Sequence, residues 1–363
     1  MSILIKRSSL VGLIGMPIFL GLCIAYNFYF SDPVEIYVPD AEGVFQYALN
    51  IHDHMVYLYN IEKISAGGID FGLNNDVGIS LIYIMISSIF PWLADSNFVY
   101  LSLVLNCFLI FMCYICYSSI CDSLGLGTLG KLSFFVNSYF LYFAQLINKD
   151  MLTVFVFLFS IYCARSKNKL LFLLLIFPIF GLVRLQLIIY IFLFVLFMLS
   201  KRSIFWIFFA YLGTSLVAGV LTVIAPVVGQ ESLGEGFSSF IVGFNQNYFV
   251  GYVLFNPLRV VQFVMDAYSS LWFFTETGGL DVAKILRVPQ LIFLLFLIRP
   301  LASISKTRYW LNTPARPLVL AIFAFLIAWL MNPTINVRYV MLITPVLALF
   351  GMYARKNTAR GCP

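Results

Sequence analysis

Charged residues are scarce in this chain of 363 residues. Asp, Glu, Lys and Arg make up 10% of it, whereas a soluble domain typically carries about 25%. This scarcity excludes an ordinary soluble domain. The net charge of +6 does not predict nucleic-acid binding, because no compact basic patch with interleaved aromatic residues occurs. Internal repeats, low-complexity tracts and a separate soluble domain are missing too, so we expect a single integral membrane domain covering 1–363.

The seven cysteines lack the spacing of a disulfide framework or a zinc site. Five of them lie in apolar runs, where a free thiol packs like a small hydrophobic group: Cys23, Cys107, Cys113, Cys116 and Cys163. A cleavable signal peptide is also missing. The first apolar run ends in YNFYFSDP rather than at a small-residue cleavage site, so we expect it to be retained as the first span.

Hydrophobic residues, in contrast, make up 62% of the chain and recur in long runs. About 20 such residues form a helix that crosses the hydrocarbon core, so the sequence predicts an all-α, polytopic helical membrane protein. Clusters of Lys and Arg mark the cytoplasmic side. They occur near both ends of the chain and at RSKNK, 165–169. We therefore expect both termini to be cytoplasmic.

The number of spans between the first outer loop and RSKNK must be odd, yet four apolar runs fit there. We assign 77–94 as the run that lies at the interface, because Pro91 and Trp92 near its end suit the headgroup level. Hydropathy alone favours a span for the same run. The resulting topology has about ten transmembrane helices, with outer loops at 31–97 and about 229–285. Its spans lie near 9–30, 98–120, 132–147, 150–164, 170–183, 187–200, 203–226, 286–303, 317–331 and 338–354.

In this topology the acidic residues lie at the outer face, and only Asp122 falls on the cytoplasmic side. Acids contribute little to membrane orientation, so this distribution indicates chemistry at the outer face. The stretch YVPDAEGVFQYALNIHDH follows the first span there. Asp40 and Glu42 are its candidate catalytic carboxylates, with helix capping by Asp40 as the alternative. His52 and His54 are two residues apart and point to different helix faces, so we interpret them as interfacial polar residues rather than metal ligands.

Three further polar sites interrupt apolar runs at expected outer span ends. Ionisable residues at membrane depth are costly and are functional candidates by default, with ion pairing or interfacial anchoring as the alternative. Arg is well suited to phosphate, because its planar fork donates two hydrogen bonds at once. QLINKDML holds Lys149 and the candidate catalytic Asp150. The candidate substrate- or phosphate-binding residues are Lys149, Arg184 and Gln186 in GLVRLQLIIY, Arg338 and Tyr339 in NVRYVMLITP, and Arg259 in the second outer loop.

A substrate with an apolar tail, a phosphate or pyrophosphate and a polar nucleophile would match these groups. Polyprenyl-phosphate-linked sugars have these parts, so the predicted chemistry is glycosyl transfer. A carboxylate acts as general base on an acceptor hydroxyl, and cations stabilise the departing phosphate. The alternatives are a lipid-linked glycan flippase or transporter, and an accessory scaffold of an envelope complex. Transporters are typically built from repeated halves with polar residues at the midplane, a pattern missing from this sequence.

Several stretches, taken in order, resemble the GT-C class of integral-membrane glycosyltransferases, and within it the bacterial O-antigen type of surface-polysaccharide polymerase. They are PDAEGVFQYA, NDVGISLIYIMISSIFP, QLINKDML, the RLQ tip and RYVMLITPVLAL, and together they cover most of the chain. The resemblance implies a site at the outer face of the bacterial inner membrane. It also implies a polyprenyl-linked glycan donor, a glycan acceptor and polysaccharide-assembly proteins as partners, besides the lipid bilayer.

The same resemblance assigns roles to single residues. It implies Asp40 as the catalytic base and Asp150 as a group that assists the acceptor or a metal ion. It further implies that Arg184 and Arg338 hold the phosphate. Unlike many members of the class, this chain has no large outer domain. The Asp-Ala-Glu spacing of Asp40 and Glu42 leaves the use of a divalent cation as cofactor open.

Overall fold

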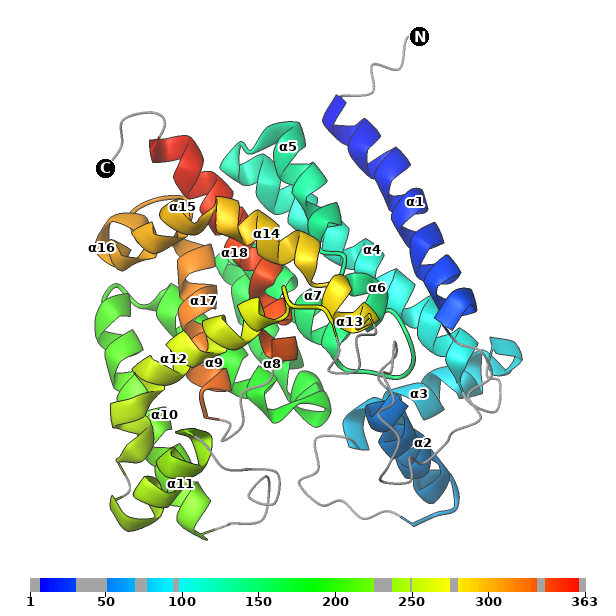
Figure 1. Ribbon diagram of the computed structural model, residues 1–363, viewed down its shortest axis with the longest axis horizontal. Helices are drawn as coiled ribbons and strands as arrows, with labels where there is room; N and C mark the ends of the chain where they lie inside the picture. Colours follow the sequence, from blue (N-terminus) through cyan, green and yellow to red (C-terminus); the bar gives the residue numbers. More distant parts are fainter. Residues whose placement is uncertain are drawn as a thin grey trace.

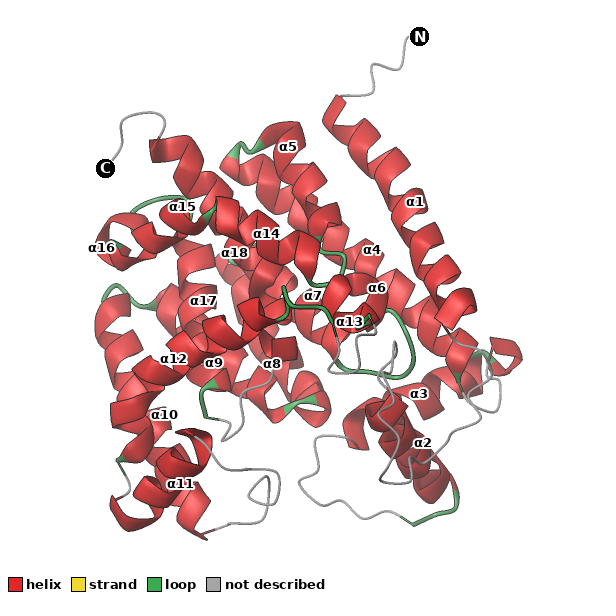
Figure 2. Cartoon of the chain, in the orientation of Figure 1, coloured by secondary structure: helices red, strands yellow, loops and turns green. Residues whose placement is uncertain are grey.

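A computed structural model describes residues 7–30, 51–68, 77–93, 98–224, 237–248, 250–274, 280–331 and 337–358. The predicted catalytic pair Asp40 and Glu42 therefore lies outside the described residues. Within the described ranges the regular structure is helical, and the isolated bridge between Phe274 and Leu280 builds no strand (Figure 2). The all-α class is confirmed.

The helices vary widely in length. The longest are α1 (Arg7–Phe30), α4 (Val99–Leu124), α8 (Lys167–Val183), α10 (Ser203–Ile224), α12 (Gly251–Ser269) and α18 (Val337–Thr358). Those of intermediate length are α2 (Ile51–Ser65), α3 (Val77–Ile89), α7 (Asp150–Cys163), α9 (Leu185–Leu199), α11 (Phe237–Tyr248), α14 (Val288–Phe296) and α17 (Arg316–Trp329). The short elements are α5 (Gly127–Leu132), α6 (Phe140–Phe143), α13 (Val282–Ile285), α15 (Ile298–Ala302), α16 (Thr307–Trp310), η1 (Pro91–Leu93), η2 (Ser133–Val136) and η3 (Ser303–Ser305).

Four of the described helices are long and apolar enough to cross a membrane. They comprise Leu10–Tyr29 of α1, α4, Ser203–Leu221 of α10, and α18. A fifth candidate is the apolar segment from Val282 to Ser305, which bends by 67° between α14 and α15. Large apolar side chains such as Leu13 on α1 and Phe208 on α10 are exposed on the outer faces of these helices. Contiguous apolar surface of this kind suits contact with lipid.

The core lies where α7, α9, α17 and α18 meet, near the centre of the molecule (Figure 1). Aromatic rings from three of these helices pack there: Phe157 on α7 lies 4.6 Å from Tyr190 on α9 and 5.6 Å from Phe325 on α17, measured between ring centroids. These three helices have 14 or 15 residues each, about 22 Å of helix. They are shorter than the roughly 30 Å hydrocarbon core and are surrounded by longer helices.

The prediction of one continuous span over 132–147 is wrong. In its place, the short elements α5, η2 and α6 follow one another and lead into a bent turn. Asn137 explains part of this, because its side-chain amide donates to the carbonyls of Ser133 and Phe134 at 3.3 and 2.8 Å and so competes with helical hydrogen bonds. Further along, Leu146 has φ of 57°, a left-handed conformation that a right-handed helix cannot contain.

The start of α1 and the end of α18 lie at the same end of the molecule, and α2 and α3 lie at the other (Figure 1). That both termini lie on one side of the membrane stays a prediction. The predicted interfacial run, 77–94, forms α3 and η1, and α3 packs against α2 and α8. Met85 and Trp92 are exposed there. With 13 residues, α3 spans about 20 Å, nearly as much as α7, α9 and α17, so whether 77–94 crosses the membrane stays open.

Candidate functional site

The turn between α6 and α7 presents Asp150, and side chains from two other helices hold its backbone. From α4, Asn106 donates to the carbonyls of Ala144 and Leu146 at 3.2 and 3.1 Å. From α2, the Nδ1 atom of His54 accepts the backbone N–H of Ile147 at 3.2 Å. Backbone groups outside regular structure must find such partners when they lie in an apolar interior.

Gln145 joins the same turn to α1. Its Oε1 atom accepts a hydrogen bond from Asn27 at 2.8 Å, and its Nε2 atom donates to the carbonyl of Cys23 at 3.2 Å. Asn148 braces the turn from within, since its Nδ2 atom donates to the carbonyl of Gln145 and its Oδ1 atom accepts the backbone N–H of Asp150. The amides in QLIN therefore fix the point at which α7 begins, and with it the position of the Asp150 carboxylate.

Two arginines from distant parts of the sequence meet at this carboxylate. Oδ1 of Asp150 lies 3.0 Å from Nη2 of Arg184, at the break between α8 and α9. Oδ2 of Asp150 lies 3.2 Å from Nε of Arg338, in the first turn of α18. The Nη1 atom of Arg338 in turn donates to Oδ2 of Asp53 on α2 at 2.6 Å. The result is an alternating chain of two carboxylates and two guanidinium groups.

The cluster is buried at one end and more open at the other. The side chains of Asp150 and Arg184 are 2% and 3% exposed, whereas those of Arg338 and Asp53 are 15% and 25% exposed. Removing charges from water is costly and is offset only by close pairing and hydrogen bonds. The exposure indicates that a solute approaching the cluster meets Asp53 and Arg338 first.

Arg184 retains hydrogen-bonding capacity inside the cluster. Within the described residues, no acceptor reaches its buried Nη1 atom. Its guanidinium carbon lies 5.7 Å from the centroid of the Tyr339 ring, a distance at which a cation is attracted to an aromatic face. The arrangement can therefore bind an additional acceptor oxygen at Arg184 beside an aromatic wall.

Four of the predicted site residues are thus brought together: Asp150, Arg184, Arg338 and Tyr339. Lys149 lies next to the cluster, with its ammonium nitrogen 5.9 Å from the centroid of the Tyr57 ring. Gln186 is half-buried in the first turn of α9.

Arg259 has different neighbours. It is fully buried on α12, and its Nη1 atom donates to Oδ1 of Asn256 at 2.8 Å and to the carbonyl of Leu330 at 2.7 Å. Its guanidinium carbon lies 5.1 Å from the Tyr252 ring centroid. These contacts tie α12 to the end of α17, and none of them joins Arg259 to the Asp150 cluster.

Sequence reasoning missed two charged members of this region. Asp53 was not singled out, because an acid in the first turn of a predicted surface helix carries no signal for a partner as distant as Arg338. Arg287 was not singled out either. It donates to the hydroxyl of Tyr139 at 2.9 Å and to Ser270 at 3.2 Å. The amides of Asn106 and Gln145 could have been found, because each is a polar residue inside an apolar run.

The carboxylates of the cluster have arginine as their partner. Across the described ranges, no three His, Cys, Asp or Glu residues are grouped as metal ligands, and both Asp53 and Asp150 contact Arg338. A divalent cation here would have to compete with a guanidinium group already in place. Metal binding by Asp40 and Glu42 stays a prediction.

His54 gives this region a pH dependence. Burial lowers the pKa of the imidazole to about 4, below the unfolded value of about 6.5, so the unfolded chain binds a proton first as the pH falls. Stability that is fully present above pH 6.5 is therefore expected to be lost between about pH 6.5 and pH 4, by up to roughly 3 kcal/mol. We expect His54→Asn, whose Oδ1 atom can still accept the Ile147 N–H, to remove this component.

The measurement is thermal unfolding in detergent over this pH range. The two proteins compared are the reference with His54 and the variant with His54→Asn. Both carry His52→Asn, so that His54 is the only histidine that titrates in the reference. If lowering the pH reduced the unfolding temperature equally in both proteins, the pH dependence would belong to groups other than His54.

Comparison of the chain with protein-family models, with curated proteins and with solved structures found no match. The function of the Asp150 cluster must therefore be inferred from its charges, its geometry and its place in the fold.

Proposed function

We propose that the chain is a membrane glycosyltransferase that takes a polyprenyl-(pyro)phosphate-linked sugar at the outer face of a bacterial inner membrane. Its product is an extended or polymerised surface polysaccharide. The observation that carries the proposal is the convergence of Arg184 and Arg338 on one buried carboxylate, Asp150. Two guanidinium groups held together in an apolar interior form a site for a phosphate whose negative charge increases as the glycosidic bond breaks.

Asp53 is the group that the phosphate would replace. It is the most exposed member of the cluster and contacts Arg338 through Nη1, one of the donors that a phosphate oxygen would use. Asp150 would keep both arginines in place, because each of its oxygens contacts one of them. The spare Nη1 atom of Arg184 would then add a donor to the bound phosphate. In this scheme Asp150 is a positioning residue.

The base in this scheme is Asp40, as the resemblance to the GT-C class implies. It would take a proton from an acceptor hydroxyl while the arginines stabilise the leaving phosphate. The proposal includes the topology of about ten crossings, with both termini cytoplasmic, and 132–147 then crosses as separate short elements rather than as one helix. It is supported by the common end of α1 and α18 (Figure 1) and by the basic residues near that end, such as Arg355 and Lys356.

The test is mass spectrometry of lipid-linked glycans from host cells. The strains are wild type, a deletion, Asp40→Asn, and Asp122→Asn as the matched control on the opposite side, all with membrane abundance measured. We expect the deletion and Asp40→Asn to accumulate the same polyprenyl-linked unit and to lose longer glycan, and Asp122→Asn to resemble wild type. A membrane-impermeant label should reach the accumulated unit.

The outcomes separate the candidate functions. A unit that accumulates but is protected from the label indicates a flippase, because the defect then precedes export. No accumulation in the deletion would contradict both the transferase and the flippase. Normal glycan in Asp40→Asn, with loss in the deletion, would assign the base to another residue.

A further inference from the structure

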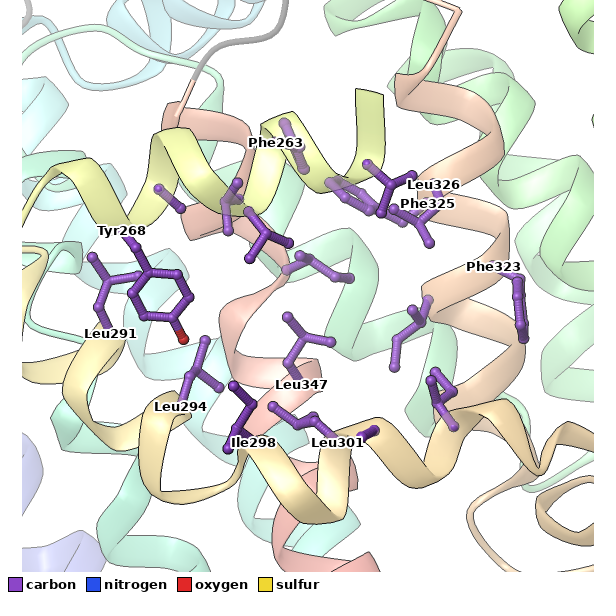
Figure 3. Close-up of a pocket in the computed structure, with 18 residues that line it drawn as sticks. Phe263, Tyr268, Leu291, Leu294, Ile298, Leu301, Phe323, Phe325, Leu326 and Leu347 are labelled. Atoms are coloured by element: carbon purple, nitrogen blue, oxygen red, sulfur yellow. The ribbon is translucent and has the colours of Figure 1, made fainter. Parts of the chain in front are cut away.

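A second site lies in a cavity of about 380 Å³ between α12, α14, α15, α17 and α18. Figure 3 shows α12 above it, α17 beside it and α15 below it. Its walls are apolar side chains, and the hydroxyl of Tyr268 is the one polar side-chain group among the lining residues. An apolar cavity of roughly 150 Å³ stays dry and takes up benzene. This cavity is more than twice as large, so an apolar chain is a far better occupant than water.

The cavity borders surface that suits contact with lipid. On α12, Val264 lines it and is 46% exposed, and on α15 Ile298 lines it and is 57% exposed. Their neighbours Met265 and Phe296 are exposed apolar residues too. A hydrocarbon chain from the surrounding bilayer could therefore enter from the side without crossing a polar surface.

Positive charge gathers at one end of the cavity. Arg299 lies on α15 between the lining residues Ile298 and Leu301, and Lys306 follows the lining residue Ile304 by two positions. Arg308 lies on the next helix, α16. All three are exposed, and none has an ion-pair partner among the described residues. The sequence contains no Asp or Glu after Asp281, so nothing nearby in the chain neutralises them.

This site is separate from the Asp150 cluster, although α18 contributes to both. Val340, Ile343 and Leu347 of α18 line the cavity, whereas Arg338 contacts Asp150 and Asp53. Val340 is two positions after Arg338, about 200° further around the helix. The two sites therefore lie on nearly opposite faces of α18, and a molecule in the cavity is not the substrate proposed for the arginines.

We propose that the cavity binds one chain of an anionic phospholipid from the leaflet at the basic end of the molecule. The lipid phosphate lies against Arg299, Lys306 and Arg308, while the chain fills the space between α12, α15 and α18. Basic residues at the cytoplasmic surface attract the headgroups of anionic lipids. The lipid fills the gap beside the bend between α14 and α15 and holds α12 against α18. This site does not depend on the glycosyltransferase proposal.

The first test measures thermal unfolding of the purified full-length protein in detergent. Either phosphatidylglycerol or phosphatidylcholine is added, and the two lipids carry identical acyl chains. We expect phosphatidylglycerol to raise the unfolding temperature in a saturable way at a lower concentration than phosphatidylcholine. A triple variant with Arg299→Gln, Lys306→Gln and Arg308→Gln should need about tenfold or more phosphatidylglycerol to reach half of the maximal rise in unfolding temperature. The matched control is a triple variant with Arg165→Gln, Lys167→Gln and Lys169→Gln. It removes three exposed charges at and just before the start of α8, and it should leave this concentration unchanged.

The second test locates the chain with phosphatidylglycerol that carries a photoreactive diazirine in its acyl tail. We expect crosslinks on cavity residues of α12, α15 and α18, and their loss in Val264→Trp, which fills the cavity from its exposed side. Crosslinks no denser there than on the outer face of α10 would overturn the proposal. Equal responses to the two lipids, or equal effects of the two triple variants, would overturn it as well.

Discussion

Asp150→Asn is expected to lower the free energy of unfolding by about 3 to 5 kcal/mol, because it leaves two guanidinium groups in a buried site without the carboxylate between them. The side chains of Asp150 and Arg184 are almost fully buried, so water cannot replace the lost charge at low cost. The change keeps the size and shape of the side chain, which separates the electrostatic effect from packing. Equilibrium unfolding in mixed detergent micelles measures it.

Asp122→Asn is the matched control. It removes a carboxylate from an ion pair with Lys131 at 2.9 Å, but the Asp122 side chain is 61% exposed, so a loss below about 1 kcal/mol is expected. Adding Arg184→Gln to Asp150→Asn should recover part of the stability, since one unpaired charge then disappears. Equal losses for Asp150→Asn and Asp122→Asn would contradict the buried cluster.

Arg184→Lys is expected to reduce glycan extension by roughly 100- to 1000-fold, the usual effect of losing one donor to a developing negative charge. Lys keeps a positive charge near Asp150 but lacks the planar fork, so the variant can ion-pair with the carboxylate and cannot also offer a second nitrogen to a phosphate. Extension of the lipid-linked unit in isolated membranes, at matched protein abundance, measures the effect.

Arg165→Lys makes the same chemical change at an exposed arginine that donates to Ser119 at 2.7 Å, and it should extend glycan like wild type. If Arg184→Lys does so too, while Asp150→Asn is unstable, then Arg184 serves only to balance the buried carboxylate. In that case the proposed phosphate site is contradicted and the structural role remains.

The sequence predicted the helical class and the interruptions at QLINKDML and RLQ, because charges inside apolar runs stand out against their neighbours. It could not predict the broken segment at 132–147, since hydropathy reports only composition. That break depends on single hydrogen bonds, such as those of Asn137, and on the backbone conformation of Leu146. Local sequence carries little information on either.

The candidate site was predicted one residue at a time rather than as a set. Arg184, Arg338 and their common partner Asp150 were predicted because each is an ionisable residue at the end of an apolar run. The part played by Asp53 could not be predicted, because it depends on a contact between α2 and the start of α18. Arg259 lies apart from the cluster, where it donates to the side chain of Asn256 and to the carbonyl of Leu330, and its role in substrate binding stays a prediction.

The ion pair between Asp53 and Arg338 joins residues 285 positions apart, and this distance sets an order of events during synthesis. The chain is made from its N-terminus, so Asp53, Asp150 and Arg184 all leave the ribosome well before Arg338. Until α18 arrives, Asp53 lacks its described partner and Asp150 has one arginine instead of two. The last helix therefore adds the second arginine to Asp150 and joins α2 to the cluster, so the four-residue arrangement forms only after α18 has been made.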